Sequence, residues 1–231
     1  TTFFYHLPTA ILGAIILVAV GKLIDLSYPK RLWKNNRNEF YILFFTFFIT
    51  LFVGISEGIM LGVFVALLYM IYQNTQPHIA VLGRIKDTHY FKNINRFTKD
   101  VVTYPQVLIL RFDGQLFFGN QRYFKQQFSA LIKKEKQPLK HLVIAAAPIS
   151  YIDATAFEML SSWMEELNDQ GITIHWTGLN GPLRDRFHKK GVFGSSHNIS
   201  IYSSLDAALN AIQGSDPSEI EKTIALQRNK I

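Results

Sequence analysis

Hydrophobic residues are distributed in two different ways along the chain, and the change falls near residue 76. Before this point long apolar runs follow one another, at residues 3–20, 40–53 and 59–72. After it, apolar and charged positions alternate at short intervals. The first run contains no Asp, Glu, Lys or Arg, and it approaches the length of about 20 residues that crosses a bilayer core. The pattern predicts membrane-spanning helices in residues 1–76.

The second and third runs are shorter, at about 14 residues each, which is short for a spanning helix. The second run is apolar on all sides of a helix, as expected in lipid or in a large protein core. Core helices of a soluble protein are the alternative, but a chain of 231 residues with a separate second part offers no core of that size. The membrane interpretation is therefore preferred.

Ser56–Gly58 separates the second and third runs, which predicts an antiparallel helical hairpin. We expect Ser56 to be the N-cap of the second hairpin helix, with Glu57 at the positive end of its dipole. Glu57 as an ionisable group with a transport role is the other interpretation, and it is the weaker one at a hairpin tip. Gly58 and Gly62, four residues apart, fit the spacing at which small residues allow close helix packing.

Positive charge predicts the orientation in the membrane. The segment between the first two runs and the segment after the third are basic, whereas the hairpin tip contains no Lys or Arg. The cations concerned are Lys22, Lys30, Arg31, Lys34, Arg37, Arg84 and Lys86. The positive-inside rule places the first loop and everything after residue 77 in the cytoplasm, with a multi-pass topology in the cell membrane.

The second part, residues 77–214, predicts an α/β domain. Strands are expected at 107–112, 141–145, 172–176 and 199–202, and residues 89–97 suggest one more strand at the sheet edge. Amphipathic helices are expected at about 124–134, 157–167, 181–187 and 205–212. Alternating strands and helices predict a mostly parallel sheet with helices packed on it. Residues 215–231 form a polar tail.

Composition excludes several kinds of site. The chain has no cysteine, and its seven histidines include no pair at spacing i,i+4, so no metal site is expected. The net charge of +7 is explained by membrane topology, because no arginine-rich strip with interleaved aromatics predicts nucleic-acid binding. No GxSxG, GxGxxG or Walker loop occurs, so neither a catalytic residue nor a cofactor is expected.

The candidate site is the turn at residues 151–156, between a strand and a helix. Backbone amides at a helix N-terminus suit a phosphate or another anion, and Thr155 offers a hydroxyl beside Asp153. The structural alternative is strong. Asp153 is a good N-cap, and Thr155–Glu158 matches a capping box.

Several stretches resemble the SulP-type anion permeases, of which sulfate permeases are examples. In the first part these are Leu7–Ile15, Glu57–Val63 and Pro77–Arg84. The second part looks like a STAS domain, through Leu116–Asn120 before its first helix and Ile152–Ala156 before its second. The resemblance extends from Phe3 to about Gln213, over the C-terminal transmembrane helices and the STAS domain.

The resemblance implies secondary transport of an anion such as sulfate, bicarbonate or a dicarboxylate. The substrate site would then lie on earlier helices outside this chain. It also implies a cytoplasmic STAS domain that takes part in homodimer contacts and regulation and is no enzyme. In the related anti-sigma-factor antagonists an Asp-Ser-Ser turn carries a phosphorylatable hydroxyl, and that position falls on Thr155. Ala154 replaces the middle serine, which leaves regulation through Asp153 and Thr155 an open hypothesis.

Two other functions compete with transport. A membrane-anchored STAS signalling module that binds a cytoplasmic protein would need a chain starting near Thr1. The apolar run begins at once, without the basic region of a signal peptide, so we expect Thr1 to lie inside a longer protein. A membrane-tethered enzyme acting on a nucleotide or phosphoester would need a phosphate loop or a catalytic pair, and the sequence shows neither.

Overall fold

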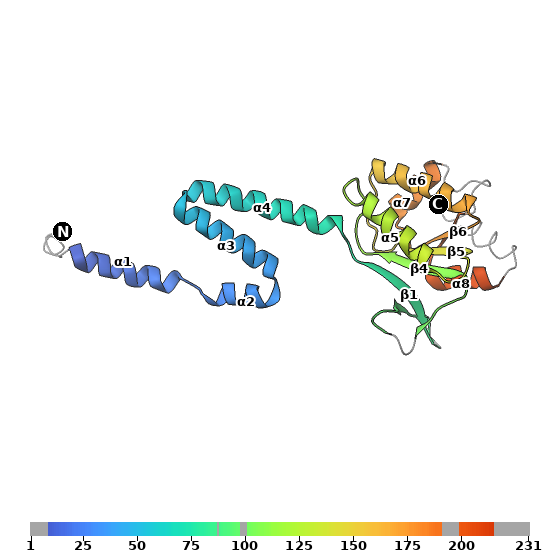
Figure 1. Ribbon diagram of the computed structural model, residues 1–231, viewed down its shortest axis with the longest axis horizontal. Helices are drawn as coiled ribbons and strands as arrows, with labels where there is room; N and C mark the ends of the chain where they lie inside the picture. Colours follow the sequence, from blue (N-terminus) through green and yellow to red (C-terminus); the bar gives the residue numbers. More distant parts are fainter. Residues whose placement is uncertain (1–8, 87, 98–100, 191–198, 215–231) are drawn as a thin grey trace. The chain divides into compact units, whose positions relative to one another are not determined.

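The structure, a computed structural model, describes residues 9–86, 88–97, 101–190 and 199–214. The chain divides into two compact units, Thr1–Ile71 and Tyr72–Ile231. The first is helical, and the second is built around a β-sheet (Figure 1). The polar tail expected at 215–231 lies outside the described residues.

The helices of the first unit confirm the three apolar runs. They are α1 (Thr9–Leu23), α3 (Arg37–Phe52) and α4 (Ile55–Thr75). Residues 3–8 of the first run lie outside the described part. By length and composition alone, two helical stretches could cross a membrane, Ile11–Asn35 and Ile55–Thr75. The first of these stretches continues past α1 into a further helix, α2 (Ser27–Asn35), which the hydrophobic pattern did not predict.

The connection in the hairpin lies earlier than expected. Helix α3 ends at Phe52 and α4 begins at Ile55, so Val53 and Gly54 make the turn. Gly54 has φ +155°, a conformation open to glycine and costly for other residues. The prediction that Ser56 is the N-cap of α4 is therefore wrong, because Ser56 already lies in the first turn of the helix. Glu57 does lie in that first turn, as expected from the helix dipole.

Small residues bring α3 and α4 into contact. A Cβ atom on Gly58 would collide with Thr50, whose Cα would be 2.7 Å away, and a Cβ on Gly62 would lie 2.6 Å from Cγ2 of Thr46. The threonine hydroxyls donate to carbonyls within α3, so no polar group is lost in the contact. The predicted close packing through Gly58 and Gly62 is confirmed, with α3 as the partner.

The second unit contains one seven-stranded sheet. Its strands are β1 (Ile79–Ile85), β2 (Phe91–Asn93), β3 (Val101–Val102), β4 (Val107–Phe112), β5 (His141–Ala145), β6 (Thr173–Thr177) and β7 (Ile199–Tyr202). The order is β2-β1-β4-β5-β6-β7, and β3 also pairs with β1. Strands β4 to β7 are parallel, whereas β1 is antiparallel to β4. The mostly parallel sheet and the edge strand within 89–97 are confirmed; β1 and β3 were not predicted.

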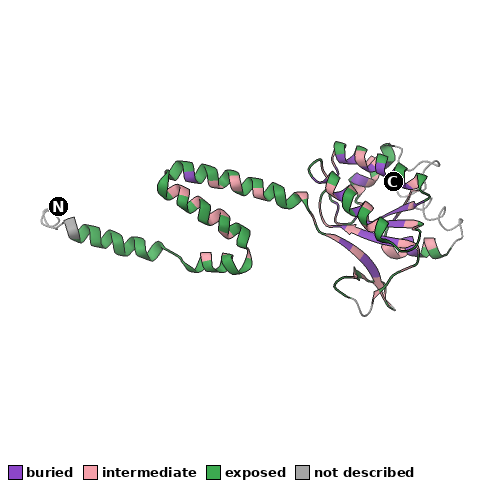
Figure 2. Ribbon diagram, viewed as in Figure 1, coloured by how far each residue is buried: buried purple, intermediate pink, exposed green. Residues whose placement is uncertain are grey.

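Helices cover both faces of this sheet (Figure 1). They are α5 (Gln121–Lys134), α6 (Ala154–Asp169), α7 (Gly181–Lys189) and α8 (Leu205–Gln213). The larger core joins one face of the sheet to α5, α6 and α7, with Phe124, Phe128 and Trp163 at its centre. The smaller core joins the other face to α8 through Ala208 and Leu209. Figure 2 shows buried residues along the strands and on the inner sides of the helices.

Candidate functional site

The turn that leads into α6 is held by Asp153. This residue is the N-cap of the helix, and its Oδ1 accepts a hydrogen bond from the backbone N–H of Ala156 at 2.7 Å. Its other carboxylate oxygen, Oδ2, accepts from the backbone N–H of Phe118 at 2.8 Å. The predicted capping role of Asp153 is confirmed. The second bond adds a role that the sequence did not indicate, since it ties the helix start to a distant loop.

That loop, residues 114–120, is fastened to the turn by backbone bonds as well. The N–H of Leu116 donates to the carbonyl of Tyr151 at 2.9 Å, and the N–H of Asp153 donates to the carbonyl of Leu116 at 3.0 Å. Buried Asn120 closes the loop, accepting from the N–H of Phe117 and donating to the carbonyls of Gln115 and Asn74. The two stretches that carry the likeness to a STAS domain are therefore joined by hydrogen bonds.

Thr155 lies in the first turn of α6 and is exposed. Within the described part of the chain no group is hydrogen-bonded to its hydroxyl. Because Asp153 is the N-cap, the capping box predicted at Thr155–Glu158 is wrong: its register is two residues too late. The hydroxyl is thus free for chemistry at a helix N-terminus, where a negative group is favoured.

A cation and two exposed aromatic residues lie at this turn. The Arg186 guanidinium from α7 donates to the carbonyl of Ile152 and lies 5.1 Å from the ring of Phe157. The side chain of Phe118 is 71% exposed and that of Tyr151 53% exposed. Sequence reasoning missed Arg186 and Phe118, which lie more than 30 residues from Asp153 along the chain. Only the folded sheet brings them together.

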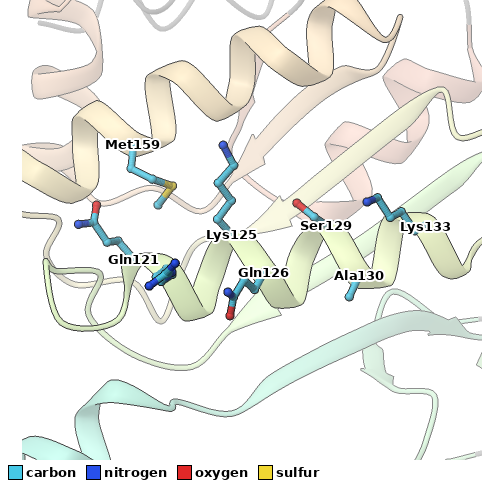
Figure 3. Close-up of a pocket in the computed structure, with 8 residues that line it drawn as sticks. Gln121, Lys125, Gln126, Ser129, Ala130, Lys133 and Met159 are labelled. Atoms are coloured by element: carbon cyan, nitrogen blue, oxygen red, sulfur yellow. The ribbon is translucent and has the colours of Figure 1, made fainter.

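A second surface feature is an open groove of about 620 Å³ between α5 and α6 (Figure 3). It is lined mainly by α5, with Lys125 and Lys133 along it and Met159 from α6 on the opposite side. Lys125 is paired with Glu166 at 2.7 Å. The groove is open to solvent, which distinguishes it from the enclosed cavities that hold small substrates.

Two histidines meet on the face of the sheet that α8 covers. Nδ1 of His141 lies 3.1 Å from Nε2 of His175, and the ring of Tyr202 is 5.7 Å from that of His175. Burial and, to a smaller extent, the nearby His141 lower the pKa of His175 to about 4. His175 is therefore neutral at physiological pH. Among the described residues no group of three or more His, Asp or Glu could hold a metal ion.

Comparison with known proteins identifies the two parts separately. The model of the sulfate permease family matches residues 1–50, and that of the STAS domain matches residues 98–208. "Probable sulfate transporter 4.2" and "Sulfate transporter 4.1, chloroplastic" of Arabidopsis thaliana are 31% and 29% identical over 75% and 80% of this chain. The structure of the murine Solute Carrier 26 family member A9 anion transporter, in the inward-facing state, covers 93% of this chain with a TM-score of 0.78. Its sequence identity is 22%, so the likeness shows a shared fold.

These matches define a membrane protein that joins apolar helices to a STAS domain. The chain belongs to the SulP family of anion permeases. It spans 27% and 28% of the length of the two Arabidopsis relatives and 35% of the murine chain. Most of each relative therefore lies beyond the part that this chain matches.

Proposed function

We propose that this chain is the C-terminal part of a SulP secondary transporter that moves sulfate or a related small anion, bicarbonate and dicarboxylates included. The observation that carries the proposal is the covalent continuity of an apolar helical hairpin with a STAS domain, in a chain whose relatives are named sulfate transporters. The anion site and the pathway are supplied by helices outside these residues. The STAS domain, with boundaries at 77 and 214, serves regulation and homodimer assembly and has no enzymatic role.

The transport proposal is tested with the protein that the complete reading frame encodes. We expect further apolar spans upstream of Thr1. We also expect uptake of radiolabelled sulfate into proteoliposomes, and unlabelled sulfate, bicarbonate or a dicarboxylate should reduce this uptake if it is the transported anion. The 231-residue chain, reconstituted in the same way, is the control and should not support uptake. A reading frame that starts just before Thr1 would overturn the proposal and favour the membrane-anchored signalling module, with a cytoplasmic protein as its partner.

The cytoplasmic position of the STAS domain is part of the proposal, and it rests on the basic loop between α1 and α3. Because these 231 residues contain no cysteine, a single cysteine introduced into the 231-residue chain is its only thiol. We expect a membrane-impermeant maleimide to label Ser56→Cys in intact cells, and to label Lys136→Cys only after permeabilisation. Labelling of Lys136→Cys in intact cells would contradict this orientation.

Regulation through Asp153 and Thr155 is supported by the free hydroxyl at a helix N-terminus and by nearby Arg186. A phosphate on Thr155 would add nearly two negative charges beside this cation. We expect phosphopeptide mapping of the protein from its native cells to find Thr155 modified, and Thr155→Glu to change the uptake rate relative to Thr155→Val. Equal uptake rates for both variants, with no phosphate found on Thr155, would contradict regulation and leave this turn with a helix-capping role alone.

A further inference from the structure

The helix that the hydrophobic pattern did not predict, α2 (Ser27–Asn35), has two distinct faces. At about 100° per residue, Tyr28, Pro29, Leu32 and Trp33 fall within an arc of about 140°. The cations Lys30, Arg31 and Lys34 fall within about 100° on the opposite side. The helix is therefore amphipathic, with aromatic residues on one face and a cluster of three positive charges on the other.

The positive charge of this segment is not neutralised by its own acids. Five cations and two carboxylates lie between Lys22 and Glu39. Glu39 is held at the start of α3, where its side chain accepts from Nδ2 of Asn36 at 2.6 Å. Asp25 accepts from the backbone N–H of Ser27 at 2.8 Å and from its hydroxyl. Within the described residues no carboxylate lies within 4.0 Å of a cation on α2.

The apolar face of α2 is only partly used for packing. The ring of Trp33 meets Phe40 edge-on at 4.9 Å and Tyr41 at 6.2 Å, which holds α2 against the first turn of α3. Trp33 nevertheless remains 47% exposed and Tyr28 48% exposed. The guanidinium of Arg37 lies 5.5 Å from the Trp33 ring. An indole with apolar residues on one side and a cation on the other is typical of the boundary between lipid and water.

Chain connectivity limits where α2 can lie. Three residues join it to α1, and Asn36 alone separates it from α3. Three residues span at most about 10 Å, so α2 stays close to the membrane ends of both helices. It does not continue the span of α1, because each cation at the bilayer centre would cost about 2.5–3.5 kcal/mol. At the interface, the apolar face of α2 can contact lipid while its cations stay in water.

We propose that α2 lies in the plane of the membrane interface and binds acidic phospholipids. Tyr28, Leu32 and Trp33 enter the boundary of the acyl chains, while Lys30, Arg31 and Lys34 bind the lipid phosphates. The inference rests on the membrane location of the family and on the cytoplasmic side proposed for this loop, whose leaflet carries anionic lipid. It does not depend on which anion the whole protein transports.

Depth in the bilayer is tested with the fluorescence of Trp33. The 231-residue chain is placed in lipid nanodiscs that contain brominated lipids, which quench a nearby indole. The other two tryptophans, Trp163 and Trp176, are buried in the STAS domain, and Trp33→Phe supplies their background signal. We expect the Trp33 component to be quenched more by bromine at a shallow position of the acyl chain than at a deep one. The same emission in brominated and ordinary lipid would overturn the interfacial position.

Lipid selectivity is tested by energy transfer from Trp33 to dansyl-labelled phosphatidylglycerol or dansyl-labelled phosphatidylcholine in mixed nanodiscs. The triple variant Lys30→Gln, Arg31→Gln, Lys34→Gln should lose the preference for phosphatidylglycerol, by about fivefold for each cation removed. The control variant Lys134→Gln, Lys136→Gln, Lys140→Gln removes the same charge from exposed positions of the STAS domain and should keep the preference.

Three outcomes would overturn lipid binding by α2. They are an equal preference for the two lipids in the unmodified chain, an equal loss in both triple variants, and full displacement of the labelled lipid by soluble glycerol phosphate. The last would mean that the headgroup anion alone is bound. None of these readouts involves transport, so a failure here leaves the proposed transport function intact, and a failed uptake assay leaves this proposal intact.

Discussion

The same apolar residue types are exposed in the first unit of the chain and buried in the second. In α3 no residue is buried, and in α4 only Gly58 is, although both helices are rich in Phe, Leu and Ile. In the STAS domain the large apolar side chains are buried, Trp163 and Trp176 among them. Figure 2 shows this contrast along the ribbon.

The contrast reflects two solvents. In water, burial of large side chains drives folding and fills a dense core. In lipid, large apolar side chains gain nothing by leaving the solvent, and helices associate where small residues let backbones approach. The contact of Gly58 and Gly62 with α3 is of this second kind.

Removal of a core aromatic should affect the two units very differently. Trp163 packs against Phe124 and Phe128 at 5.5 and 5.9 Å, and its Nε1 donates to Ser129 at 3.2 Å. We expect Trp163→Ala to lower the free energy of unfolding of the STAS domain by about 3–5 kcal/mol. Phe45→Ala, on the exposed side of α3, should leave it unchanged. Urea titration of both variants in micelles, followed by Trp176 fluorescence, measures the difference. A loss below about 1 kcal/mol for Trp163→Ala would contradict the central place of Trp163 in the core.

Addition of a single methyl group should destabilise the helical hairpin of the first unit. Gly58→Ala would force the backbone of α4 away from Thr50, and we expect a loss of about 1–3 kcal/mol in hairpin packing. Gly13→Ala on α1 is the matched control, because nothing lies within 4 Å of its added Cβ. The SDS fraction at which the helices separate reports the packing. The idea fails if both variants separate at the same fraction.

Acid should weaken the STAS domain through His175. Its pKa falls from 6.5 to about 4 on folding, so the unfolded chain binds the proton more readily between these values. Stability is therefore complete above pH 6.5 and is lost as the pH falls toward 4. We expect a loss of about 2 kcal/mol between neutral pH and pH 5 from this residue. His175→Gln should flatten the pH profile of urea unfolding in this window, and an unchanged profile would assign the acid sensitivity to other groups.

The helix caps should give the smallest effect. Asp153→Ala removes the acceptor of two backbone N–H groups, and we expect a cost of about 1–2 kcal/mol to the STAS domain. Asp153→Asn keeps one of the two acceptor oxygens but turns an NH2 group toward the other backbone N–H, so it should cost less than Asp153→Ala and still destabilise the domain. At the start of α3, Asn36 accepts from the N–H of Glu39 at a long 3.4 Å, so Asn36→Ala should matter less than Asp153→Ala. Thermal unfolding of the three variants ranks them, and a larger effect at Asn36 would reverse the comparison.

Much of this architecture could be predicted from local patterns. The apolar runs predicted α1, α3 and α4, and the short alternation after residue 100 predicted β4 to β7 with α5 to α8. Helix α2 was missed because its cations and Pro29 interrupt the apolar run, although its two faces are evident once the helical period is applied. Strand β1 was missed because Gly83 and Arg84 interrupt the apolar residues of Ile79–Ile85.

The sequence by itself determined which parts face lipid and which face water, because that division follows from the length and period of the apolar runs. It also marked Asp153 as the start of α6, since a cap depends on residues three positions apart. Only the tertiary structure decided that Gly58 packs against Thr50. It also decided that Phe118 and Arg186 form hydrogen bonds with the turn that contains Asp153. The physical reason is that such contacts join segments far apart along the chain, and they form only when a sheet or a hairpin has closed the distance between them.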